Sequence, residues 1–538
     1  MGFRDGASRS GTLTRLSLET TRISCVFRTQ QDVPRLRDAP SSGEGGAPMR
    51  SATHDGSASA LRAELGHPVI DADGHTVEFL PALLPYFKKA GVADHVEQFY
   101  ARILDSGAGL WSAMSPEDRA AHRTVRPSWW AVPAKNTRDF ATATMPTLLY
   151  ERMDELGLDF GVIYPSLGLV LPDIADTELR RACCRALNQF HADAFDGLGD
   201  RLTPVAVIPM GAPDEAIEEL EYAVEHLGIK AALISSFVRR PVEALADRGR
   251  DVRFQASWAD SYGIDSPYDY DPFWQRCLDL GISPAAHSGA VGWDGHRSVS
   301  NYVYNHLGFF ARPSETLCRS LFLGGVTRRF PDLRLALLEG GVSFGTRLLN
   351  DLIGHFEKRN QEAIQNYNPA HFDRALFESL LDRHGARFRE MGGGPDIQEL
   401  AFGTPSGQAE PDDEFAPCEL TDASEIPDLF TKNFFFGCEA DDPLIHHAFD
   451  PKGLPKGVQL STLYGSDIGH WDVPDMRDVL HEAWEGVEEG RLDRDQFRAF
   501  TFENAVRFYT DTNPRFFEGT RIEAEVDAFR ASDQISST

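Results

Sequence analysis

A run of apolar residues that ends in an acid and a histidine places the strongest constraint on how this chain can fold. The run reads Val69-Ile70-Asp71-Ala72-Asp73-Gly74-His75, with Glu78 just beyond it. In an extended strand, side chains two residues apart point to the same side, so Asp73 and His75 can bind one ion. Three later apolar runs end in the same way, at His287, Glu339 and Asp467. Four runs that each end in a potential ligand predict one shared centre.

Short apolar segments recur along the chain and predict strands at 69–73, 160–164, 203–208, 230–235, 283–287, 334–339, 433–437 and 460–466. Between and after them, apolar residues at three- and four-residue spacing predict helices at 177–198, 214–227, 314–329, 344–356, 476–489 and 494–509. Alternation of strands and helices predicts an α/β fold with a parallel sheet. Polar residues gather at the C-terminal ends of many strands, and no GxGxxG loop is present. The pattern therefore favours a (β/α)8 TIM barrel over an open doubly wound sheet.

The expected domain organisation is one barrel domain at 61–515, between an N-terminal tail at 1–60 and a C-terminal tail at 516–538. Residues 1–48 are rich in Arg, Ser and Gly and contain no apolar segment long enough for a secretory signal. Their acidic residues argue against an organellar transit peptide. A disordered tail is one interpretation, and an upstream start codon with Met49 as the true first residue is the other.

Several segments between the predicted strands are too long for plain connections. Insertions after barrel strands lie on the catalytic face, so residues 76–150 are expected to form a lid. Residues 237–272 and 288–312 are further long loops on the same face. Residues 384–428, with three consecutive glycines and an acidic stretch, are interpreted as a surface excursion.

Composition excludes some classes of partner. The chain of 538 residues has 53 basic and 82 acidic residues, a net charge of −29, which repels nucleic acid and anionic membrane surfaces. The 7 cysteines are scattered and show no CxxC spacing, so reduced thiols in a cytoplasmic protein are the simplest interpretation. No run of about 18 apolar residues is present to span a membrane.

Asp73, His75, His287 and Asp467 form the predicted metal site, since two imidazoles and two carboxylates suit Zn²⁺, Mn²⁺, Fe²⁺ or Co²⁺. Each residue also has an ordinary structural explanation: a helix cap, two buried core histidines and a turn residue. Their common place at strand ends favours the metal site. The fourth strand ends without a residue to bridge two ions, and Lys230 lies at its start, so one ion is expected.

These motifs resemble the amidohydrolase-related family, specifically its aminocarboxymuconate-semialdehyde decarboxylase-like branch. The resemblance runs from about Val69 to about Tyr509. It rests on Ile70-Asp71-Ala72-Asp73-Gly74-His75, Ala286-His287-Ser288-Gly289, Arg329-Phe330-Pro331-Asp332-Leu333 before Glu339-Gly340-Gly341, Gly465-Ser466-Asp467 with His470 and Asp472, and Glu503-Asn504-Ala505. The resemblance implies a (β/α)8 barrel with one divalent ion, Zn²⁺ first, at the positions of Asp73, His75, His287 and Asp467. It also implies a homodimer as one possible assembly.

Two positions depart from the family pattern. Where many members have His-x-His, this chain has Asp73-x-His75, which resembles the acid-x-His version of the benzoate-type decarboxylases. Glu339 stands where the sixth strand usually ends in a catalytic histidine, and a carboxylate there can accept a proton or join the metal but cannot present a neutral N–H donor. His306 and His470 are the candidates to replace the missing imidazole, although a surface or lid-packing role is open for both.

Substrate binding has three candidates in the long loops, Arg239, Arg240 and Trp293. The arginine pair could bind a substrate carboxylate, while its ordinary explanation is solvated surface. The leading hypothesis for function is a metal-dependent decarboxylase acting on a small aromatic or unsaturated carboxylic acid, with Asp467 or Glu339 moving a proton to carbon. The alternatives are a hydrolase that uses a metal-activated water on an amide, ester or lactone, and a barrel without catalytic activity.

Overall fold

The computed structural model describes residues 57–92, 111, 114–126, 135–244, 257–287, 297–391, 413–470 and 473–536. The chain divides into two units, Met1–Thr53 and His54–Thr538, and all described residues belong to the second. No helix among the described residues is both long and apolar enough to cross a membrane.

Parallel strands form the centre of the fold, at all eight positions expected from the sequence. They are β1 (Ile70–Thr76), β2 (Phe160–Pro165), β3 (Leu202–Pro204), β4 (Ala206–Val207), β5 (Ala232–Ile234), β8 (Pro284–Ala286), β9 (Leu335–Leu337), β10 (Phe434–Glu439) and β11 (Ser461–Gly465). One sheet has three strands in the order β1-β2-β3, and the other has six in the order β11-β10-β9-β8-β5-β4. Every ladder in these two sheets is parallel.

The predicted closed barrel differs from the observed pairing, because among the described residues no ladder joins β3 to β4 or β11 to β1. At the first break, the N–H of Val205 donates to Ile163 O, whereas the N–H of Ala206 donates to Ala231 O, so the chain changes partner within one residue. At the second break, the N–H of Ser466 donates to the side chain of Asp71 instead of to the backbone of β1. The fold is therefore an α/β protein with two parallel sheets.

Two further strands were not predicted. β6 (Val238–Pro241) and β7 (Ser257–Asp260) pair antiparallel in the long insertion after β5. Their short sequences, VRRP and SWAD, contain no alternation of apolar and polar residues long enough to predict a strand.

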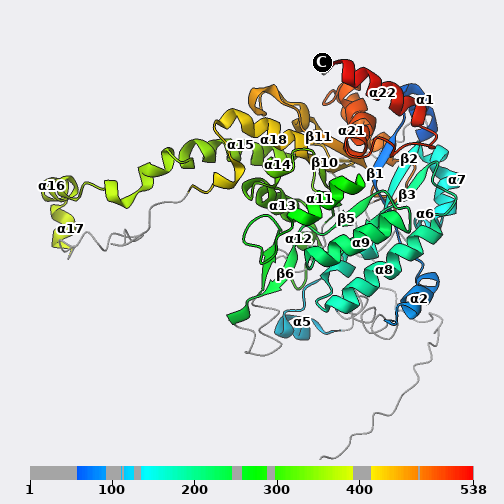
Figure 1. Ribbon diagram of the computed structural model, residues 1–538, viewed down its shortest axis with the longest axis horizontal. Coiled ribbons are helices and arrows are strands. Elements are labelled where there is room, and N and C mark those ends of the chain that lie inside the picture. Colours follow the sequence, from blue (N-terminus) through cyan, green and yellow to red (C-terminus); the bar gives the residue numbers. More distant parts are fainter. Residues whose placement is uncertain are drawn as a thin grey trace, which may run out of the picture. The chain divides into compact units, whose positions relative to one another are not determined.

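Helices lie between successive strands and surround the sheets in Figure 1. α8 contacts α9, α9 contacts α11, and α13 and α18 both contact α15. The helices are α1 (Ala58–Leu65), α2 (Leu80–Lys89), α5 (Pro116–His122), α6 (Thr137–Thr144), α7 (Pro146–Leu156), α8 (Thr177–Ala194), α9 (Pro213–Glu225), α11 (Asp271–Leu280), α12 (Tyr302–His306), α13 (Ala311–Leu323), α14 (Val326–Arg329), α15 (Ser343–Arg359), α16 (Arg374–His384), α17 (Ala386–Glu390), α18 (Ile426–Asn433), α19 (Val479–Glu488), α20 (Arg494–Arg498), α21 (Asn504–Thr510) and α22 (Glu523–Ser536).

The predicted helix at 314–329 is broken in two by Gly324 and Gly325, which separate α13 from α14. Gly325 has φ of 74°, and a Cβ there would lie 2.1 Å from Pro417 O. Only glycine fits this left-handed, tightly packed turn. The predicted helix at 494–509 continues through a π-helical segment, Ala499–Glu503, between α20 and α21.

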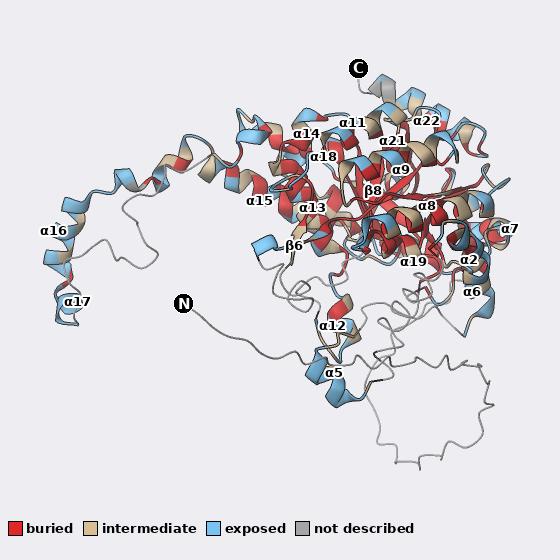
Figure 2. Ribbon diagram, turned by 60° about the horizontal axis from the view of Figure 1, so that its bottom comes forward, coloured by how far each residue is buried: buried red, intermediate tan, exposed pale blue. Residues whose placement is uncertain are grey.

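The core consists of apolar side chains from the strands and from the helix faces turned toward them, drawn red in Figure 2. Residues 516–538, expected as a C-terminal tail, contain α22 and contribute Phe516, Phe517 and Phe529 to one of the core clusters. By contrast, no residue of α16 or α17 is buried.

The two insertions expected near the catalytic face contact each other. Trp111 Nε1 donates to Val299 O at 2.8 Å, and Asn305 Nδ2 donates to Arg126 O at 2.7 Å. These bonds join the insertion after β1 to the loop after β8.

Candidate metal centre

The ends of three parallel strands bring the four predicted ligands together. Asp73 and His75 lie on β1, His287 follows β8, and Asp467 follows β11. Since the carboxyl ends of parallel strands open on one side of a sheet, short strands suffice to gather residues far apart in sequence. All four residues are buried, with exposed fractions of 0% to 4%.

The donor atom of His75 lies close to donor atoms of the other three residues. His75 Nε2 lies 3.4 Å from Asp73 Oδ1 and 3.5 Å from Asp467 Oδ1. His287 Nε2 lies 3.2 Å from His75 Nε2 and 3.6 Å from Asp73 Oδ1. Donors bound at about 2.0–2.2 Å to one ion are themselves separated by roughly 3–3.6 Å. The observed spacings therefore suit a single ion.

The charges of the site also suit a cation. Burial lowers the pKa of His75 and of His287 well below the usual value, so two neutral imidazoles face each other. Burial, together with the nearby charges of Asp71 and Glu439, raises the pKa of Asp73 well above its usual value. Asp73 Oδ1 is buried and accepts no hydrogen bond from the described residues. A divalent ion would supply the missing partner.

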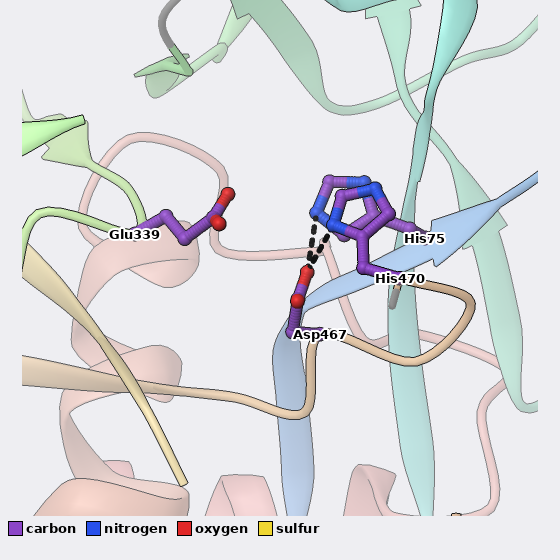
Figure 3. Close-up of side chains that lie close together, drawn as sticks. All are labelled: His75, Glu339, Asp467 and His470. Carbon is purple, nitrogen blue, oxygen red and sulfur yellow. Dashed lines mark ion pairs between the residues drawn. The ribbon is translucent and has the colours of Figure 1, made fainter. Parts of the chain in front are cut away.

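Glu339 and His470 extend the cluster. Glu339, which follows β9, places Oε2 at 3.1 Å from His287 Nε2. His470 Nδ1 contacts Asp467 Oδ1, and its ring stacks on His75 with centroids 3.9 Å apart. Figure 3 shows Glu339 approaching from the side opposite to His75 and His470, with its carboxylate directed toward them.

The two acids that end β9 and β11 share an unusual backbone. Glu339 has φ of 54° and Asp467 has φ of 48°, both in the left-handed region. Residues other than glycine rarely adopt it, and such strain persists mainly at functional sites. The conformation turns both carboxylates into the cluster.

Three further acids lie around the site, and the sequence analysis assigned none of them a role. Asp71 accepts hydrogen bonds from Ser466 and Asp73. Glu78, named only as lying beyond the first motif, accepts from the N–H of Leu167. The end of β10 carries Glu439, whose charge reaches Asp73. Their contacts depend on which strands become neighbours, although Asp71 stands in the first motif and Glu439 lies just past a predicted strand.

The other predicted site residues lie outside this cluster or outside the described residues. His306 stacks on Tyr302 and lies 6.4 Å, centroid to centroid, from Phe310, which in turn packs against the His287 ring. Arg239 donates to Ser257 Oγ. Trp293 lies outside the described residues.

Arg240 is bonded within the β6–β7 hairpin region. Its guanidinium donates to Asp260 Oδ2 at 2.5 Å, to Gly211 O at 3.0 Å and to the Tyr270 hydroxyl at 3.0 Å. These bonds use all three guanidinium nitrogens, so they hold the hairpin against the loop after β4.

Structural comparison finds distantly similar proteins. An amidohydrolase from Mycobacterium avium subsp. paratuberculosis K-10 is 17% identical, with 82% of this chain and 99% of that chain covered and a TM-score of 0.48. A dihydroxybenzoic acid decarboxylase from Polaromonas sp. JS666, with bound manganese and 2-nitroresorcinol, is 15% identical (84% and 99% covered, TM-score 0.44). A 2,6-dihydroxybenzoate decarboxylase from Rhizobium is 13% identical (82% and 99% covered, TM-score 0.43).

Comparison with curated proteins gives no match. Residues 121–358 match the sequence model of a family described as Amidohydrolase. The matched region contains His287 and Glu339, while Asp73, His75 and Asp467 lie on either side of it. Through this region, the chain is similar to the amidohydrolase family.

Proposed function

We propose that this protein is a metal-dependent decarboxylase that acts on a small aromatic or unsaturated carboxylic acid. One divalent ion would be held by Asp73, His75, His287 and Asp467 at the carboxyl ends of the parallel strands. The observation that carries the proposal is the contact between His75 Nε2 and His287 Nε2 at 3.2 Å, beside the buried Asp73 carboxylate. Two neutral imidazoles and buried acids at this spacing are typical of residues that bind a cation.

Such an ion, when bound, would hold the substrate carboxylate and stabilise the negative charge that develops as CO2 leaves. The residues of the chain have to supply the rest of the chemistry. When the carbon–carbon bond breaks, its electron pair stays on the ring or alkene carbon, and a proton must reach that carbon. The pair formed by Asp467 and His470 is the proposed proton source, because its two side chains are in direct contact.

The surroundings of the site favour a flat, apolar substrate. Phe310 is 5% exposed, and its ring packs edge-on against His287 with centroids 5.2 Å apart. Phe237 and Phe309 form a buried cluster with Phe310. A substrate carboxylate beside these aromatic rings would lose bound water, which destabilises its negative charge. Decarboxylation would remove this desolvation cost, because CO2 is uncharged.

Hydrolysis remains the second candidate because of Glu339. A carboxylate next to the ligand His287 can accept a proton from water, but it cannot donate an N–H to a substrate as a neutral imidazole would. The same set of ligands would then serve attack of water on an amide, ester or lactone carbonyl.

The test is product analysis with the metal-loaded full-length protein. A panel of aromatic and unsaturated carboxylic acids would be screened for CO2 release in ¹⁸O-labelled water, with His287→Ala as the inactive control. Release of CO2 without ¹⁸O in the organic product is the expected result. Incorporation of ¹⁸O into the organic product without CO2 release would contradict decarboxylation and favour the hydrolase.

A further inference from the structure

Glu339 lies as close to the proposed ligands as they lie to one another. Its Oε2 is 3.1 Å from His287 Nε2, and its side chain is 3% exposed. Its carboxylate also lies within 4.8 Å of the donor atoms of His75 and Asp467. Ligands of one ion are separated by roughly 3–4.2 Å, and the 3.1 Å between Glu339 Oε2 and His287 Nε2 falls in this range.

The backbone at Glu339 is in the left-handed region. Its φ of 54° is strained for glutamate, whereas glycine adopts this conformation without such a cost. A carboxylate that merely capped the loop would accept from the amides of the next residues. The N–H of Gly341, however, donates to Gly437 O. The Glu339 carboxylate lies against His287 Nε2.

The geometry favours one ion over two. His75 and His287 both approach the cluster through Nε2, and the contacts of His75 with Asp73 and Asp467 use this same atom. A ring nitrogen has one lone pair, so it binds one ion. Glu339, which contacts His287 Nε2, would therefore reach the ion that the other ligands hold.

We propose that Glu339 is a fifth ligand of this ion, together with Asp73, His75, His287 and Asp467. The inference rests on the proposed function for the existence of the ion. The donor set would then contain three carboxylates and two imidazoles. Zn²⁺ is satisfied by four donors, whereas an oxygen-rich, higher-coordinate set suits Mn²⁺ or Fe²⁺. The third carboxylate thus tunes the site toward Mn²⁺ relative to Zn²⁺.

The experiment measures Mn²⁺ binding to metal-depleted full-length protein by the loss of the free-ion EPR signal. Glu339→Gln keeps the shape of the side chain and removes its charge, and we expect the Kd for Mn²⁺ to rise about 100-fold. Glu439→Gln is the matched control, because it removes one nearby negative charge at another strand end. For this control we expect a rise of less than about threefold. Thermal unfolding of the metal-free variants checks that both are folded.

A second variant tests the selectivity. Glu339→His offers nitrogen in place of oxygen, and we expect it to bind an ion while raising the preference for Zn²⁺ over Mn²⁺ at least tenfold. Equal Mn²⁺ affinity in Glu339→Gln, Glu439→Gln and the parent would overturn the role of Glu339, even if His287→Ala loses the ion. If the parent and His287→Ala both fail to bind any ion, the proposed metal centre fails as well.

Discussion

Ser466 donates two hydrogen bonds to the carboxylate of Asp71, from its backbone N–H at 3.0 Å and from its hydroxyl at 2.5 Å. A third donor, the N–H of Asp73, lies 3.2 Å from the same carboxylate. Burial raises the pKa of Asp71 to about 6, while the bonds from Ser466 oppose this rise. The Asp71 side chain thus links β1 to Ser466 at the end of β11. The residues that it joins are next to or part of the proposed ligand set, Asp73 and Asp467.

This link predicts a graded loss of stability. Ser466→Ala removes one bond to a buried carboxylate and should lower the free energy of unfolding by about 1–2 kcal/mol. Asp71→Ala leaves three buried donors without an acceptor and should lower it by about 3 kcal/mol or more. Urea denaturation of the metal-free proteins measures both values. Equal stabilities for Asp71→Ala and Ser466→Ala would show that the carboxylate does not join the strands.

Much of the fold was predictable because it depends on local patterns. Each parallel strand is a short apolar run between polar turns, and this is visible without knowledge of its neighbours. The break between α13 and α14 was missed because the restriction on Gly325 comes from Pro417, far away in the sequence. The pairing between β11 and β1 also depends on residues far apart in sequence, because Asp71 accepts the N–H of Ser466 while Asp73 O accepts the N–H of Asp467.

Part of the candidate site could also be predicted from the sequence, and part could not. Asp73, His75, His287 and Asp467 could be named because strand ends in a parallel fold converge on one face. Their mutual contact at His75 Nε2 agrees with that expectation. Sequence alone could not decide whether Glu339 capped a loop or pointed into the cluster. That choice depends on a backbone φ of 54°, which no local pattern dictates.

His287→Ala should abolish metal binding and activity together. The imidazole touches His75, Asp73 and Glu339, so its loss removes a donor from the middle of the cluster. Elemental analysis should find about one ion per parent chain and a small fraction of that in the variant. His306→Ala is the control, because the His306 ring packs near Phe310, which in turn packs against His287. Full metal content in His287→Ala would refute the ligand assignment.

His470→Asn should separate proton transfer from metal binding. Asparagine can keep a donor near Asp467 but cannot exchange a proton near neutral pH, so turnover should fall about 10²- to 10⁴-fold with the ion retained. Ser166→Ala removes the hydroxyl that lies 3.4 Å from His470 Nε2 and should cost less than about tenfold. Steady-state kinetics and elemental analysis on the same samples give both quantities. Loss of the ion from His470→Asn would instead identify His470 as a ligand.

His67 should make the protein less stable in mild acid. It is 6% exposed, stacks on Phe502 and contacts Pro68 O through Nδ1. Burial lowers its pKa, with smaller contributions of the same sign from Arg498 and Arg62 and an opposing one from the Pro68 carbonyl. Below about pH 6.5 the unfolded chain therefore binds a proton that the native protein does not, so stability falls as the pH falls through that value.

The change that tests this effect is His67→Gln, with the exposed His384→Gln as its control. Between about pH 6.5 and pH 5, the parent should lose up to roughly 1.4 kcal/mol of unfolding free energy per pH unit more than His67→Gln does. His384→Gln should follow the parent. Denaturant titrations at several pH values give the slopes directly. Parallel slopes for the parent and His67→Gln would mean that other buried histidines, such as His75 and His287, carry the acid sensitivity.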